Sequence, residues 1–208
     1  LLKIKKQVNN KSKNCLILSC ETLRYPVKIQ SWPYVEDYKL WFGDICNLVD
    51  NFNKNIKKNV VYRCGSPKDG FETSSQFKKK YPQLRISSVF DSSLNKELNN
   101  TKLIVSTYPD TATAEAFMSN LPVVITFSNK LYKLSKKFDE VLNELIKNKV
   151  FFSDPKKASD HINEIWEDPY KWWDKENTQK AVTKYKNFSF NVKKNWQTEW
   201  SEFIKQQI

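Results

Sequence analysis

The chain has 208 residues, 39% of them hydrophobic, which is enough for one domain with a substantial core. No uninterrupted apolar run reaches the roughly 20 residues that a membrane-spanning helix requires. The net charge of +12 is spread over short basic groups beside acids, so we expect a solvated surface or attraction to nucleotides, lipid phosphates or acidic glycans, and no nucleic-acid partner.

The amino-terminal stretch, residues 1–14, is rich in lysine and asparagine and has no usable periodicity. We expect it to be a linker or a disordered lead-in. Because the chain begins with leucine, we also expect it to be the carboxyl-terminal part of a longer protein, whose amino-terminal domain lies outside this sequence.

The four cysteines, Cys15, Cys20, Cys46 and Cys64, form no CxxC pair, and the single histidine, His161, is distant from them in sequence. A structural zinc site needs ligands at close spacing, so we expect no metal site. Three of the cysteines lie in apolar stretches, which favours buried free thiols in a reducing cytosol.

The first half of the chain alternates β-rich apolar runs with amphipathic stretches. Strands are predicted at residues 15–18, 59–62 and 84–86, and helices at 34–52, 73–81 and 92–99. The loop after the first strand carries Glu21 and Arg24, and the loop after the second contains two of the three glycines. Loops at this end of a sheet often carry function.

The second half continues the alternation. Strands are predicted at residues 102–106, 123–125 and 150–152, and helices at 131–148 and from Pro155 onward. The whole pattern predicts an α/β fold across residues 15–167, with a Rossmann-like, doubly wound, mainly parallel sheet of about six strands.

The carboxyl-terminal extension, residues 168–208, is predicted to be helical and is rich in aromatic residues. Trp196, Trp200 and Phe203 recur at helical spacing and form a stripe. We expect this extension to pack on the body or on a domain outside the chain. Core packing explains the stripe better than sugar stacking does.

Residues 106–126 are the most informative segment, because they form the pattern strand end, Ser/Thr/Pro/Asp turn, helix and strand. Such a turn presents free N–H groups and the positive end of a helix dipole, which suits a phosphate group. Asp110 or Thr111 can cap the helix. Capping explains Glu115 poorly, because no Ser or Thr stands three residues before it; a functional role and a dipole-favoured acid both remain open.

Four segments carry a family resemblance: residues 63–71, 105–116 and 120–125, and 165–168 together with Trp172 and Trp173. Their central pattern is Thr-x-x-x-Glu-Ala followed by Asn-x-Pro-Val. In these segments the chain resembles the carboxyl-terminal, donor-binding domain of GT-B-type glycosyltransferases. More closely, it resembles a family of transferases encoded in bacterial O-antigen and surface-polysaccharide loci.

The resemblance implies the donor-binding half of a glycosyltransferase. Such an enzyme moves a sugar from a nucleotide-activated donor to a surface polysaccharide or a lipid-linked acceptor, without a metal and without a tightly bound cofactor. It would act in the cytoplasm, with peripheral contact to the anionic inner face of the membrane as a further expectation. An amino-terminal acceptor domain would complete the enzyme.

The resemblance also implies roles for single residues. Arg63, Ser106, Thr111 and Thr113 would bind the donor phosphates, and Glu115 would bind the ribose. The resemblance assigns no catalytic base.

Three further residues are candidates for a loop that contacts donor or acceptor: Glu21, Arg24 and Tyr108. The chain departs from its relatives at Asp110, where they tend to have glycine. Either Asp110 points away as the helix cap, or it weakens or alters phosphate binding. A non-catalytic or degenerate α/β module that binds a nucleotide or an acidic glycan therefore remains the alternative.

Overall fold

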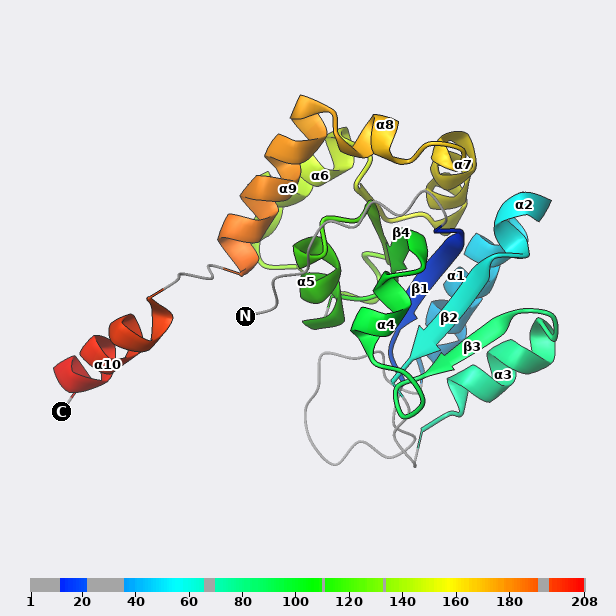
Figure 1. Cartoon of the computed structure of the whole chain (residues 1–208), viewed down its shortest axis with the longest axis horizontal. Helices are drawn as coiled ribbons and strands as arrows, with labels where there is room; N and C mark the ends of the chain where they lie inside the picture. The colour runs from blue at the N-terminus through cyan, green and yellow to red at the C-terminus, as the bar shows by residue number, and fades with distance from the viewer. Residues whose placement is uncertain are drawn as a thin grey trace.

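The computed structural model describes residues 12–21, 36–65, 70–109, 111–132, 134–190 and 195–207. Arg24 and Asp110 lie outside these residues. The described strands form one six-stranded parallel sheet in the order β3-β2-β1-β4-β5-β6 (Figure 1). Their bounds are β1 Asn14–Ser19, β2 Val60–Cys64, β3 Arg85–Ser88, β4 Thr101–Ser106, β5 Val123–Thr126 and β6 Phe151–Phe152.

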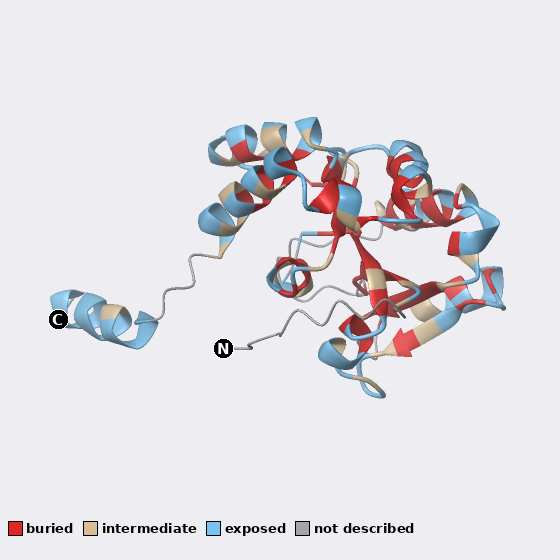
Figure 2. Ribbon diagram, turned by 45° about the horizontal axis from the view of Figure 1, so that its top comes forward, coloured by how far each residue is buried: buried red, intermediate tan, exposed pale blue. Residues whose placement is uncertain are grey.

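The sheet is covered by helices, as the strand sequences require. The central strands β1 and β4 are almost completely buried, and near-continuous apolar runs are typical of parallel strands that are covered on both faces. Figure 2 shows this buried centre beneath more exposed helices. The strand order reverses direction between β1 and β4, the place where open α/β sheets commonly bind ligands.

The connecting helices pack in two groups: α1 packs against α7, and α9 packs against α5 and α6. The bounds are α1 Tyr38–Asp50, α2 Lys54–Lys57, α3 Thr73–Lys80, α4 Leu94–Leu98, α5 Thr111–Met118, the short 3-10 helix η1 Lys136–Phe138, α6 Asp139–Lys147, α7 Pro155–Ile165, α8 Tyr170–Trp173, α9 Glu176–Ser189 and α10 Trp196–Gln207. None of the described helices is long and apolar enough to cross a membrane.

The predicted fold class is confirmed, and the strand positions differ from the predicted ones by one or two residues at most ends. Two helices were predicted too long: the helix expected at 34–52 has the bounds Tyr38–Asp50, and the helix expected at 131–148 begins only at Asp139. For the second helix the reason is local: Ser135 Oγ accepts a hydrogen bond from the Lys137 N–H at 3.3 Å, which starts the separate turn η1. All four cysteines are buried, as expected.

The aromatic extension divides into two parts. Trp172, Trp173 and Tyr185 are buried against the body. The stripe of Trp196, Trp200 and Phe203 on α10 is exposed, with 47–59% of each residue accessible, and α10 stands apart from the sheet (Figure 1). In this structure the stripe does not pack on the body, and packing on another domain, the second arm of the expectation, stays a prediction.

Candidate functional site

One row of residues crosses the sheet near its carboxyl edge. Strand register pairs these residues side by side: Ser87, Arg63, Leu18, Ser106, Ile125 and Phe151. Residues paired across a parallel sheet point to the same face. Ser106 contacts Thr113 of α5, so the side chains of the whole row lie on the side of the sheet that carries α5. Arg63 and Ser106 are separated by one strand, or about 10 Å.

The turn between β4 and α5 is fixed by hydroxyl groups. Ser106 Oγ and Thr113 Oγ1 lie 2.6 Å apart, and the Tyr108 carbonyl oxygen lies 2.9 Å from the first and 2.8 Å from the second. Both hydroxyl-bearing residues are almost completely buried. Since each hydroxyl has one proton, these contacts engage both of them, so the two side chains hold the turn in shape.

Thr107 adds a contact that the sequence analysis did not identify. Its N–H and its hydroxyl both donate to the carbonyl oxygen of Leu18, at 3.0 and 2.9 Å. This joins the turn to the end of β1. The only sequence signal was the position of Thr107 directly after a predicted strand.

The hydroxyl groups of Ser106, Thr107 and Thr113 are used inside the turn, so the start of α5 is the part of it that can bind a ligand. The first N–H groups of a helix have no acceptor within the helix, and they carry the positive end of its dipole. Thr111 is the first residue of α5 and is exposed. Glu115 is also exposed, one turn further along.

Arg63 is held at the same edge by β3. Its Nη1 donates to Ser87 Oγ at 2.8 Å and to the Ser88 carbonyl oxygen at 3.2 Å. Burial lowers the pKa of Arg63 from its usual value, and the charges of Glu97 and Glu115 act in the opposite direction.

A second group of polar residues supports Arg63. Ser87 Oγ donates to Glu97 Oε1 at 2.9 Å, and Arg85 donates to both carboxylate oxygens of Glu97, at 3.1 and 2.5 Å. The hydrogen bonds from Arg85 are the main cause that lowers the pKa of Glu97 to about 2. Sequence reasoning missed this group, although Arg85 and Ser87 alternate on one strand and so share a face.

Glu21 has a geometry that sequence reasoning did not anticipate. Its carboxylate accepts hydrogen bonds from the Phe71 N–H at 3.0 Å, the Thr73 N–H at 2.8 Å and the Thr73 hydroxyl at 2.7 Å. It thus satisfies donors at the start of α3. Gly70 permits this approach, because a Cβ there would lie 2.4 Å from Glu21 Cγ. A contact of Glu21 with donor or acceptor stays a prediction.

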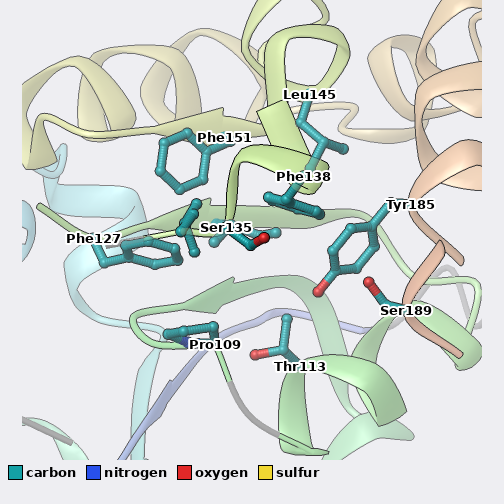
Figure 3. Close-up of a pocket in the computed structure, with 11 residues that line it drawn as sticks. Pro109, Thr113, Phe127, Ser135, Phe138, Leu145, Phe151, Tyr185 and Ser189 are labelled. Atoms are coloured by element: carbon teal, nitrogen blue, oxygen red, sulfur yellow. The ribbon is translucent and has the colours of Figure 1, made fainter. Parts of the chain in front are cut away.

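A pocket of about 260 Å³ opens on the other side of the turn from Arg63. Its lining is mainly apolar and comes from β5 and the residue after it, η1, α6, β6 and α9, including Phe127, Phe138 and Phe151 (Figure 3). Thr113 and Pro109 form its edge next to the turn. Tyr185 and Ser189 place hydroxyl groups at one end, as Figure 3 shows.

The described site residues thus fall into three sets. In the first, Arg63 and Ser106 lie in one row of the sheet, and Thr111, Thr113 and Glu115 lie on α5. In the second, Glu21 accepts hydrogen bonds at the start of α3. Tyr108 is buried and contributes its carbonyl oxygen to the turn. Within the described residues, no three His, Cys, Asp or Glu side chains gather closely enough to hold a metal ion.

Comparisons with known proteins give a family and a distant structural likeness. A model of the LIC12162 family, which is described as a family of transferases, matches residues 1–204. No curated protein sequence matches the chain. Among solved structures, a crystal structure of TarM is similar with 16% sequence identity and a TM-score of 0.47. That likeness covers 88% of this chain but only 34% of the TarM chain.

Proposed function

Because the chain belongs to the LIC12162 family of transferases, we propose that it binds a nucleotide-activated sugar and forms the donor-binding half of a glycosyltransferase. The observation that supports this proposal is the fixed turn at the start of α5, with Arg63 on the same face of the sheet. The donor diphosphate lies against the N–H groups that begin α5. Arg63 supplies the opposing charge.

The hydroxyl contacts refine the role of each residue in this proposal. Ser106 and Thr113 give shape to the turn, since their protons are engaged inside it. The backbone N–H groups of α5 and the hydroxyl of Thr111 then contact phosphate. Glu115, exposed on the next turn, accepts hydrogen bonds from the ribose hydroxyls. Cation and helix dipole together stabilise the charge that develops on the departing diphosphate.

A nucleotide screen tests this assignment. We expect one of UDP, GDP, dTDP, CDP and CMP to raise the melting temperature of the chain; a nucleotide at 100 times its Kd stabilises by about 2.7 kcal/mol. Arg63→Gln should weaken binding at least tenfold, since a hydrogen bond to a charged group contributes roughly 1.5–3 kcal/mol. Glu115→Gln should weaken it less, because the amide keeps one acceptor.

Lys171→Gln, an equal change of charge far along the chain on α8, is the control and should bind normally. If no nucleotide shifts the melting temperature of the folded wild-type chain, donor binding by this chain alone is refuted. In that case a non-catalytic module is the better description. Two features favour that alternative: the use of Glu21 as a cap on α3 and the residue Asp110 in the turn.

The apolar pocket beside Thr113 bears on the acceptor. We propose a lipid-linked acceptor rather than a free glycan, because most of the lining of this pocket is hydrocarbon and would exclude the hydroxyl groups of a sugar. Phe138→Ala should therefore raise the KM for a lipid-linked acceptor in the complete enzyme several-fold. Affinity for the nucleotide should stay the same, and an unchanged KM would contradict the proposal.

The remaining features of the proposed function rest on the resemblance. The reaction would use no metal, the acceptor half would come from another domain, and the enzyme would act in the cytoplasm near the anionic inner face of the membrane. The chain spans about a third of the TarM chain that it resembles.

A further inference from the structure

A second pocket, of about 490 Å³, lies at the opposite edge of the sheet from the α5 turn. Residues 147–149 on its wall directly precede β6, and the strands are parallel, so this is the amino edge. The end of α7, Trp172 of α8 and the start of α9 complete the wall. The pocket therefore shares no residue with the site proposed for the donor.

The charges around this pocket are unequal. Three lysines line it, Lys147, Lys149 and Lys175, against two carboxylates, Glu164 and Glu176. Lys149 Nζ lies 3.5 Å from Glu164, and Glu176 lies 2.6 Å from Lys180 Nζ, which is not part of the lining. Among the residues that the structure describes, Lys147 and Lys175 form no ion pair, so the pocket keeps two uncompensated cations.

The start of α9 adds donors to the same wall. Lys175 is the N-cap residue of this 14-residue helix, and its side chain makes no capping hydrogen bond. The first N–H groups of α9, at residues 176–178, have no acceptor within the helix. All three of these residues line the pocket, so the helix presents its positive end there.

His161 gives an independent indication that the pocket receives a ligand. Only 4% of its side chain is exposed, yet neither ring nitrogen has a hydrogen-bond partner among the described residues. The nearest carboxylate oxygen, on Glu164, is 3.8 Å from Nδ1, which is too long for a hydrogen bond. Buried polar groups are nearly always paired, so an unpaired imidazole that lines a cavity implies a missing partner.

The protonation state of His161 fits an anionic ligand. Burial lowers its pKa to about 4, helped by the positive charges of Lys149 and Lys175 and opposed by Glu164. At neutral pH the imidazole is therefore uncharged and has one N–H to donate. Its ring packs between Phe152 and Trp172, with centroids 5.5 and 4.9 Å away, and this packing fixes its direction.

We propose that this pocket binds the phosphate group of a soluble phosphorylated ligand, through Lys147, Lys175, the first N–H groups of α9 and the ring of His161. Phosphate oxygens accept hydrogen bonds from all of these donors. The site is separate from the α5 turn, so a ligand there affects the chain without competing with the donor.

NMR of the single histidine tests this proposal directly. Because the chain contains one His, its imidazole signals need no assignment by mutation. Inorganic phosphate, titrated at constant ionic strength with chloride, should shift these signals until they saturate. Lys175→Gln should weaken the response at least tenfold. Lys171→Gln, which removes an exposed lysine outside the pocket, should leave it unchanged.

Three results would overturn the proposal: no saturable shift with phosphate, an equal response in Lys175→Gln, or a response only to vesicles that contain phosphatidic acid. The last would indicate a membrane headgroup instead of a soluble ligand. The test is independent of the donor site, because Arg63→Gln should lose nucleotide binding and keep the full response of His161 to phosphate.

Discussion

Single side chains at the carboxyl edge act through their neighbours. Ser87 accepts from Arg63 and donates to Glu97, so one hydroxyl sets the direction of the guanidinium. The position of Arg63 at a strand end and that of Thr113 in the first turn of a helix could be predicted from the sequence, because the strand and the helix each have a recognisable pattern. The partnership with Ser87 could not, since it depends on the register between β2 and β3.

The first prediction concerns this hydroxyl. Ser87→Ala removes one hydrogen bond from Arg63 and one from Glu97. Both bonds involve a charged group, so we expect the free energy of unfolding to fall by about 1–3 kcal/mol. Nucleotide affinity should fall several-fold as the guanidinium becomes free to turn. Urea denaturation and calorimetry measure the two effects. Ser88→Ala is the matched control, because Arg63 contacts only the Ser88 carbonyl oxygen; an equal loss in both variants would contradict the account.

At the scale of single elements, the backbone conformation at the end of α6 could not be predicted from the periodicity of the sequence. The Lys149 N–H donates to the Ile146 carbonyl oxygen and the Val150 N–H to the Leu145 carbonyl oxygen, at 3.0 and 2.8 Å, which closes α6. This ending requires the left-handed conformation at Lys149, whose φ is 59°. The predicted end of this helix at residue 148 is correct to within one residue. Glycine is the usual residue at such a position, so the left-handed conformation of Lys149 could not be predicted from its residue type.

The second prediction follows from this strain. Lys149→Gly should raise the free energy of unfolding by about 1 kcal/mol, because a side chain in the left-handed conformation costs about 1–2 kcal/mol. Lys147→Gly, two residues earlier and inside α6, should lower it by about 1 kcal/mol. Urea denaturation measures the free energy of unfolding of both variants. A loss of stability in Lys149→Gly would show that Lys149 is not strained.

The whole molecule is a sheet with different chemistry at its two edges. The carboxyl edge carries the α5 turn, Arg63 and an apolar pocket, and the amino edge carries the lysine-lined pocket around His161. The alternation of strands and helices was sufficient to predict the parallel sheet and the turn that follows β4 at its carboxyl edge. The second pocket could not be predicted, because its residues come from four helices, α6 to α9, that meet only after folding.

The third prediction concerns how the free energy of unfolding of the whole molecule depends on pH. The pKa of His161 is about 4 in the folded chain and near 6.5 when unfolded. Between these values the unfolded chain binds a proton that the folded chain does not, so stability falls as the pH is lowered from about 6.5 to about 4. The slope approaches about 1.4 kcal/mol per pH unit.

His161→Phe should remove most of this slope while keeping the aromatic packing. Urea denaturation at several pH values from 7.5 to 4.5 gives the measurement. Glu97 acts at lower pH, because its folded pKa of about 2 lies below its usual value, and its contribution is lost only as the pH falls from about 4.5 toward 2. The same slope in wild type and His161→Phe would contradict a neutral, buried imidazole.

A crystal structure of the chain with the nucleoside diphosphate that binds best tests the proposed donor site directly. We expect the phosphates to lie within hydrogen-bond distance of the first N–H groups of α5, next to Arg63, with the ribose hydroxyls on Glu115. Phosphates bound away from α5, or a ribose far from Glu115, would show that the carboxyl edge of this sheet is not the donor site.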